Sequence, residues 1–147
     1  MTAPTATANV TSVVPLLMVT SMERSLAFYV DGLGFAIQSR WEPDGKLRWC
    51  CMGLGGAFLM LQEAIESSRE KLAAAGALGN GVGIWFQCRD AIAIYREASA
   101  RGIPTIREPQ VGNNSWEIAF ADPDGYRINF SSPTDLPEET LLSESGL

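Results

Sequence analysis

The chain has 147 residues, enough for one domain with a sizeable core, and 46% of them are hydrophobic. Its formal net charge of −6 comes without a cluster of basic residues. This argues against nucleic acid as a partner, because phosphate binding needs Lys and Arg gathered on one surface. The acidic balance favours a cationic ligand over an anionic one, although a charge of this size is also ordinary for solubility.

The sequence contains no histidine, which excludes Ser-His-Asp and Cys-His nucleophile systems and histidine-ligated zinc or iron. The adjacent Cys50 and Cys51 and the distant Cys88 form a poor disulfide framework, so we expect a cytoplasmic protein. The apolar run at residues 13–19 is too short to span a bilayer and follows no basic segment. We therefore expect no membrane association and no signal peptide.

The first half of the chain predicts a strand, a helix and three further strands. Residues 1–9 are rich in Thr, Ala and Pro and are expected to form a flexible tail. The helix is capped by Thr20 or Ser21 and ends near Gly32, and its apolar residues recur every three or four positions. The strands of this half are predicted at residues 10–19, 35–41, 46–52 and 57–62.

The second half predicts the same order of elements. Residues 64–81 are expected to form a linker with a short helix near residues 67–75, and residues 133–147 a C-terminal tail. A helix capped by Asp90 ends at Gly102. A type I turn at residues 122–125, Asp-Pro-Asp-Gly, joins the last two strands. The strands of this half are predicted at residues 82–88, 103–107, 115–121 and 126–131.

A single offset of 69 residues aligns the two halves. It places Ser21 on Asp90 as helix caps and Gly56 on Gly125 at turns. Such a repeat indicates two similar modules, neither of which can close its sheet alone. The sequence therefore predicts an α+β fold with two tandem βαβββ modules, residues 10–63 and 82–132, packed around a central cavity.

Two segments resemble the vicinal-oxygen-chelate superfamily, which holds glyoxalase I, extradiol dioxygenases, and fosfomycin- and bleomycin-resistance proteins. Residues 19–29, followed by Gly-Leu-Gly-Phe at 32–35, are similar to its first strand-to-helix motif. Residues 120–128 are similar to its last hairpin. The resemblance covers about residues 10–132. It implies curved sheets around a cavity, usually in a homodimer, with the cavity often completed by the partner chain.

Enzymes of this superfamily usually hold a divalent metal with two His and one Glu, and in some a further acid. Carried over by motif, those positions are Val14, Gly83, Asn129 and Met60. Hard cations need several oxygen ligands, and transition metals need imidazole, thiolate or carboxylate. One amide oxygen satisfies neither requirement. We therefore expect no metal, no other cofactor, and a metal-free cavity that binds a small aromatic or cationic molecule.

Strand alternation around these positions indicates which side chains could line the cavity. Met and flat aromatic side chains suit a large planar ligand, and Gly83 leaves room for close approach, although strand Trp residues also commonly pack in a core. Trp116 alternates with Glu117, so only one of the two can face the cavity. The predicted ligand-binding residues are Val14, Trp41, Trp49, Met60, Gln62, Gly83, Trp85, Trp116 and Asn129.

Three functions remain open from the sequence. The first is a binding protein that sequesters a toxic small molecule, like the bleomycin-resistance branch. The second is a metal-independent or atypical-metal enzyme, such as a lyase, isomerase or dioxygenase-like protein, with Glu63, Glu117 or Asp122 as general base. The third is a homodimer that binds a metabolite for regulation.

Overall fold

The computed structural model of the chain describes residues 6–147, and its two halves contain the same order of strand, helix and three strands. The first half contains α1 (Ala6–Asn9), β1 (Leu16–Val19), α2 (Met22–Leu26), the π-helix η1 (Ala27–Gly32), β2 (Ala36–Trp41), β3 (Trp49–Leu54) and β4 (Ala57–Glu63). After α3 (Glu66–Ala74) come β5 (Gly83–Gln87), α4 (Ala91–Ala100), β6 (Gln110–Gly112), β7 (Ser115–Ala121), β8 (Arg127–Pro133) and the 3-10 turn η2 (Leu142–Glu144).

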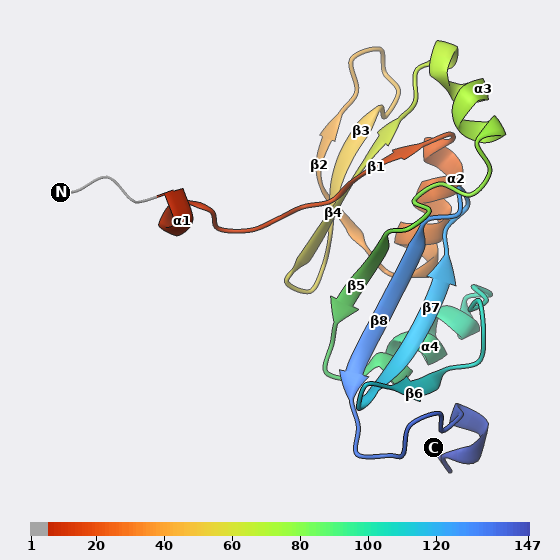
Figure 1. The fold of residues 1–147 in the computed structure, drawn as a ribbon. Coiled ribbons are helices and arrows are strands. Elements are labelled where there is room, and N and C mark those ends of the chain that lie inside the picture. The colour runs from red at the N-terminus through yellow and green to blue at the C-terminus, as the bar shows by residue number, and fades with distance from the viewer. Residues whose placement is uncertain (1–5) are drawn as a thin grey trace.

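Each half forms one four-stranded mixed sheet, with the strand orders β1-β4-β3-β2 and β5-β8-β7-β6. In both sheets the first strand pairs in parallel with the last, and the other pairs are antiparallel. The two sheets meet where β1 and β5 lie near each other (Figure 1). The predicted α+β fold with two tandem βαβββ modules is confirmed.

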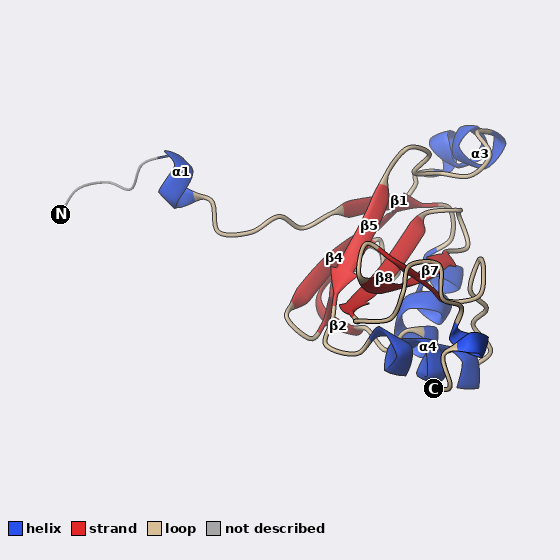
Figure 2. Ribbon diagram, turned by 60° about the horizontal axis from the view of Figure 1, so that its bottom comes forward, coloured by secondary structure: helices blue, strands red, loops and turns tan. Residues whose placement is uncertain are grey.

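One face of each sheet is covered by a helix. Helix α2 packs on β4, and α4 packs on β7 and β8, so that both helices lie on the same side of the strands (Figures 1 and 2). Leu59 and Leu61 of β4 and Ile128 of β8 are fully buried on this side. The residues between them point the other way, because successive strand residues alternate between faces. We call the side without α2 and α4 the open face of each sheet.

Aromatic rings join the two modules into one core. The ring centroids of Phe35 and Phe86 lie 5.7 Å apart, and those of Phe28 and Phe120 lie 6.5 Å apart. In each pair one residue comes from the first module and one from the second. Aromatic pairs of this kind contribute about 0.5–1.5 kcal/mol beyond the area they bury. The hydrophobic core is therefore continuous between the modules.

The turn between β7 and β8 docks on the first module. Gly125 N donates to Asp122 O at 3.0 Å, which closes the predicted turn. The Tyr29 hydroxyl donates to Asp122 Oδ2 at 2.8 Å, and the Thr20 hydroxyl donates to Asp124 Oδ1 at 2.5 Å. We call Thr20, Tyr29, Asp122 and Asp124 the clasp. Because its members come from both modules, the clasp stabilises their packing.

Two strand predictions were wrong. Strand β1 begins only at Leu16, because Val10 and Val13 are 75% and 87% exposed and pair with no described strand. Residues 103–107 form no strand. The strand that precedes β7 is β6, at residues 110–112. The register of β6 is set by a two-residue turn at Asn113 and Asn114, whose φ angles of 49° and 58° suit a tight hairpin.

The structure also resolves the ends of the elements. Ser21, not Thr20, caps α2, since its hydroxyl accepts from Arg24 N at 3.3 Å. The predicted short helix of the linker is α3.

In the C-terminal segment, Glu138 accepts from the backbone of both Asn residues of the β6–β7 turn, at 2.9 and 2.7 Å. The N-terminal tail prediction falls partly on residues 1–5, which lie outside the described residues.

Candidate functional site

The open face of the second sheet holds a cavity of about 660 Å³, which we call the second-sheet cavity. This volume is in the range of sites for drug-sized ligands. Strands β5, β7 and β8 form its floor, and the loop before β5 forms one wall. Its lining comprises residues 77–83, Trp85, Ile106, Arg107, Glu117, Ala119, Gly125, Arg127 and Asn129.

Three of the predicted site residues line this cavity together. Trp85 of β5 lies beside Asn129 of β8 in the strand register, and the Trp85 side chain is 47% exposed. The Asn129 side chain is buried, and its Nδ2 donates to Ile84 O at 3.2 Å. A Cβ added at Gly83 would lie 3.1 Å from Trp85 Nε1 and 3.5 Å from Asn129 Nδ2. The missing side chain at Gly83 therefore keeps this part of the cavity open.

The cavity also contains two arginines, Arg107 and Arg127, that were not among the predicted site residues. Arg107 Nη2 donates to Glu117 Oε2 at 2.8 Å, and Arg127 lies on β8 two positions before Asn129. Strand alternation could have identified Arg127, since it shares a strand face with Asn129. No pattern could have identified Arg107, because it was assigned to a strand that does not form.

A second hollow, of about 490 Å³, adjoins the first at the junction of the modules. Pro15, Leu16 and Leu17 line it from the first module, and residues 82–84 and Tyr126 from the second. Arg127 borders both hollows. The Tyr126 hydroxyl donates to Met18 O at 2.8 Å and so fixes the distance between the modules at this point.

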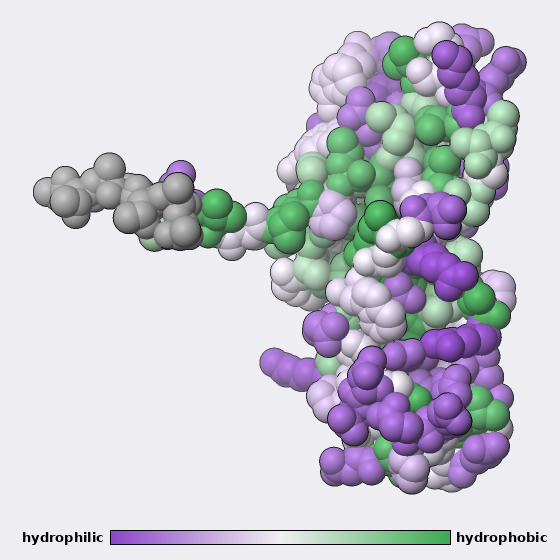
Figure 3. All heavy atoms as spheres, in the orientation of Figure 1, coloured by the Kyte–Doolittle hydropathy of each residue, from purple (hydrophilic) through white to green (hydrophobic). Residues whose placement is uncertain are grey.

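Three other predicted residues lie in one row on the open face of the first sheet. Cross-strand register aligns Trp41 with Trp49 and Trp49 with Gln62. Met60 lies in the neighbouring row, beside Leu16. No described hollow includes these four side chains. In Figure 3, apolar surface gathers along the middle of the face shown, whereas the lower end is mostly hydrophilic.

The remaining two predicted residues lie elsewhere. Trp116 is 4% exposed and packs in the hydrophobic core, so it is Glu117 and not Trp116 that reaches the second-sheet cavity. Val14 is half-buried, precedes β1 and lines neither hollow. Sequence alternation left the face of Trp116 undecided, and only the packing of α4 on β7 decides it.

The positions that would hold a metal in the resembling enzymes do not fit one. Met60 pairs with Leu16 across the first sheet, and Asn129 pairs with Trp85 across the second. These side chains offer one thioether and one neutral amide, and a divalent cation needs several charged or imidazole donors. Within residues 6–147 no three Cys, Asp or Glu side chains gather in a metal-binding arrangement.

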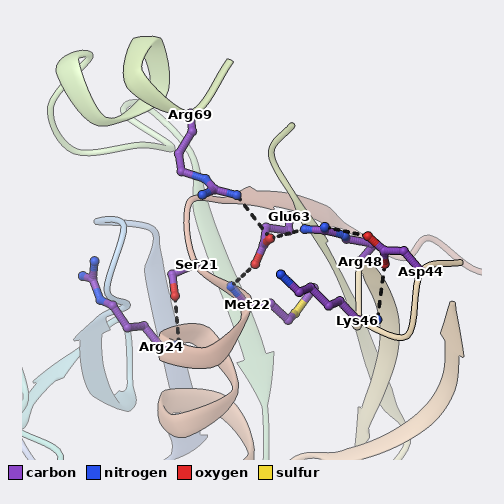
Figure 4. Close-up of polar contacts among 8 residues, drawn as sticks. All are labelled: Ser21, Met22, Arg24, Asp44, Lys46, Arg48, Glu63 and Arg69. Carbon is purple, nitrogen blue, oxygen red and sulfur yellow. Dashed lines mark hydrogen bonds and ion pairs between the residues drawn. The ribbon is translucent and has the colours of Figure 1, made fainter. Parts of the chain in front are cut away.

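Two of the candidate bases are occupied by structural contacts. Glu63 Oε1 accepts from Arg48 at 2.8 Å and from Arg69 at 3.3 Å, and its Oε2 accepts from Met22 N at 2.8 Å (Figure 4). Glu63, the last residue of β4, thus links α2 and α3 to Arg48, the residue before β3. Asp122 belongs to the clasp, where burial raises its pKa. Neither carboxylate lines the second-sheet cavity.

The three cysteines are free thiols. Cys50 is buried in the core and Cys51 lies on the open face beside Met60, so they point to opposite faces as predicted. Burial raises the pKa of both Cys50 and Cys88, and the Cys88 thiol donates to Ser131 O at 3.3 Å. A raised pKa lowers the thiolate fraction, which makes these two thiols poor nucleophiles.

None of the helices among the described residues is both long and apolar enough to cross a bilayer.

A comparison with curated protein sequences found no match. Residues 10–130 match the family model of the glyoxalase/bleomycin resistance protein/dioxygenase superfamily.

Several solved structures have a similar fold. A glyoxalase/bleomycin resistance protein/dioxygenase from Nocardioides superposes with a TM-score of 0.64 and 21% identity, over 93% of each chain. A bleomycin-binding protein in complex with bleomycin gives 0.60 and 20%, over 84% of this chain and 98% of that one. TnmS3, an antibiotic-binding protein from Streptomyces sp. CB03234, gives 0.60 and 23% over the same shares. At these identities the likeness shows the fold alone.

Proposed function

Because the chain belongs to the glyoxalase/bleomycin resistance protein/dioxygenase superfamily, we propose that it binds a small planar aromatic molecule in the second-sheet cavity, without metal, and sequesters it unchanged. The observation that carries this proposal is Trp85, a large aromatic side chain left 47% exposed on the floor of a cavity of about 660 Å³. An indole in this position offers a flat stacking surface to a planar ligand.

The names of two structural neighbours support a binding role over a catalytic one. The bleomycin-binding protein and TnmS3 are both described as binding an antibiotic. The donor set around Met60 and Asn129 gives no support to metal chemistry. Sequestration needs only a shaped cavity with a few polar groups, and the second-sheet cavity has both.

A metal-independent enzyme is the weaker alternative. Its general base would be Glu117, the one carboxylate among the described residues that line the cavity. Glu117 is ion-paired with Arg107 at 2.8 Å, and a base must be free to take a proton from the substrate. The contact therefore favours a role for Glu117 in holding Arg107 in place.

We further propose that the protein is a homodimer in which a second copy covers the open face of the first sheet. Support comes from Leu16, Trp41 and Phe58, which are 47%, 54% and 44% exposed on this face. Contiguous exposed apolar surface is typical of an interaction site. Sedimentation should give twice the mass of one chain, and Phe58→Arg should shift the protein towards monomer. The matched variant Arg89→Gln, an exposed residue between β5 and α4, should leave the mass unchanged.

We also propose a cytoplasmic location. Support comes from the three free thiols among the described residues, which suit a reducing compartment. Thiol labelling of the protein in intact cells, before and after lysis under non-reducing conditions, should find all three cysteines reduced.

The binding proposal is tested by thermal unfolding against tricyclic planar compounds and bleomycin, followed by mass analysis of the recovered compound. A true ligand present at a hundred times its Kd adds about 2.7 kcal/mol of apparent stability. Trp85→Ala should abolish this gain, and Ile65→Ala, at an exposed site outside the cavity, should retain it. The proposal fails if no compound raises the unfolding temperature, or if the recovered compound has been converted.

A further inference from the structure

Arg127 occupies an unusually open position on the floor of the second-sheet cavity. Its cross-strand neighbours are Gly83 on β5 and Ala121 on β7, the two smallest side-chain types. It borders both the cavity of about 660 Å³ and the adjoining hollow of about 490 Å³. Neither cross-strand neighbour therefore has a side chain large enough to restrict the guanidinium.

The guanidinium of Arg127 also has no partner among residues 6–147. Within the part of the chain that the structure describes, it makes no hydrogen bond or ion pair with another residue. Its neighbour in the cavity, Arg107, is paired with Glu117. Arg127 thus presents five N–H donors and a full charge to whatever enters the cavity.

Neutral donors lie close to the same point. The indole Nε1 of Trp85 and the amide Nδ2 of Asn129 both lie within 3.5 Å of where a Cβ at Gly83 would be. An indole N–H can only donate, and one Asn129 N–H remains after its bond to Ile84 O. The charged residues of the lining are Arg107, Arg127 and Glu117, so the cavity carries a net positive charge in a chain of net charge −6.

We propose that the ligand of the second-sheet cavity carries an acidic group, such as a carboxylate or an ionised phenol, which pairs with Arg127 and accepts from Trp85 Nε1 and Asn129 Nδ2. This inference rests on the proposed function, because it names the chemical class of the molecule that the cavity sequesters. A guanidinium and a carboxylate form short, charge-assisted hydrogen bonds that are about twice as strong as neutral ones. A cationic ligand would place its charge beside an unpaired arginine.

Three tricyclic probes of matched shape test the charge preference: anthraquinone-2-carboxylate, anthraquinone-2-carboxamide and 2-(aminomethyl)anthraquinone. Binding is measured by titration calorimetry and by quenching of tryptophan fluorescence on the full chain. The carboxylate should bind at least tenfold more tightly than the amide, and the amine should bind most weakly. Arg127→Gln should remove the advantage of the carboxylate and leave amide binding within about twofold. Arg127→Lys should recover part of that advantage, since it keeps the charge without the planar fork.

Arg96→Gln is the matched control, because Arg96 is an exposed arginine of α4, away from the cavity. It should leave the affinity for all three probes unchanged. The inference is wrong if the amide or the amine binds as tightly as the carboxylate, or if Arg127→Gln binds the carboxylate as well as the wild type does. In those cases the cavity still binds planar aromatics and the proposed function stands. If none of the probes binds, the proposed function fails together with this inference.

Discussion

The open faces of the two sheets differ in chemistry although the scaffolds beneath them are alike. Phe58 and Met60 of β4 correspond, 69 residues later, to Arg127 and Asn129 of β8. The buried positions between them keep their apolar character in both modules. Core positions must stay apolar to fill the space under α2 and α4, whereas open-face positions are free to change. Equivalent open-face positions on the same framework thus carry apolar side chains in the first module and polar or charged side chains in the second.

The turns of the two modules differ in the same way. Residues 122–125, Asp-Pro-Asp-Gly, form half of the clasp, whereas the equivalent residues 53–56, Gly-Leu-Gly-Gly, have no polar side chain to donate or accept. The polar contacts of the clasp therefore come from the turn of the second module, and they add to the aromatic pairs and the Tyr126–Met18 hydrogen bond that also join the modules. Variants in the clasp, the turns and the cavity test how far this asymmetry governs stability and binding.

The largest effect is expected for Asp122→Ala. The substitution removes the acceptor of the Tyr29 hydroxyl and of the backbone N–H groups of Asp124 and Tyr126, and it leaves a buried hydroxyl unpaired. We expect a loss of about 3 kcal/mol in the free energy of unfolding, measured by urea denaturation. Asp135→Ala, at an exposed position, should change stability by less than about 0.5 kcal/mol. A loss below about 1 kcal/mol for Asp122→Ala would mean that the clasp does not hold the modules.

Gly125→Ala and Gly56→Ala compare equivalent turn positions. Gly125 has a φ of 95°, and an added Cβ would lie 2.7 Å from Ala77 Cβ and 2.8 Å from Ala77 Cα. An added Cβ at Gly56 would meet no atom within 4 Å. We expect Gly125→Ala to cost about 2 kcal/mol in urea denaturation and Gly56→Ala less than about 0.5 kcal/mol. Equal costs would show that the two turns are under the same constraint.

Gly83→Ala should separate binding from stability. A Cβ there would crowd Trp85 Nε1 and Asn129 Nδ2, but Trp85 is half exposed and can move. We expect the affinity for anthraquinone-2-carboxylate to fall about tenfold in titration calorimetry, equivalent to about 1.4 kcal/mol. The free energy of unfolding should stay within about 0.5 kcal/mol. Gly56→Ala serves as the control, and unchanged affinity in Gly83→Ala would place the ligand elsewhere.

The smallest effect is a pH dependence that arises from the clasp. Burial raises the pKa of Asp122 above its usual value of 3.8, so the folded state binds its proton more tightly than the unfolded state does. Its contribution to stability is present below pH 3.8 and is lost as the pH rises through the raised pKa. Denaturation of wild type and Asp122→Asn across this window should show a decline in the stability of wild type relative to the variant. A relative stability that rises with pH would contradict the direction of the shift.

Much of the fold follows from local patterns in the sequence, but the site follows only in part. The stripe from Met22 to Leu33, the Asp90 cap and the turn at residues 122–125 each depend on neighbours in the chain, and the structure contains all three. The strand predicted at residues 103–107 does not form, because β6 takes its register from the turn at residues 113–114.

The repeat, the two βαβββ modules and the exclusion of histidine chemistry follow from the sequence alone, because periodicity and composition are properties of the chain. The burial of Trp116, the exposure of Trp85 and the position of Arg107, which lines the cavity from a loop, depend instead on how the elements pack together. Alternation divides a strand into two faces, but it does not say which face a helix covers. The packing of α2 and α4 makes that choice, and it leaves Arg127 on the open side, where no described residue pairs with it.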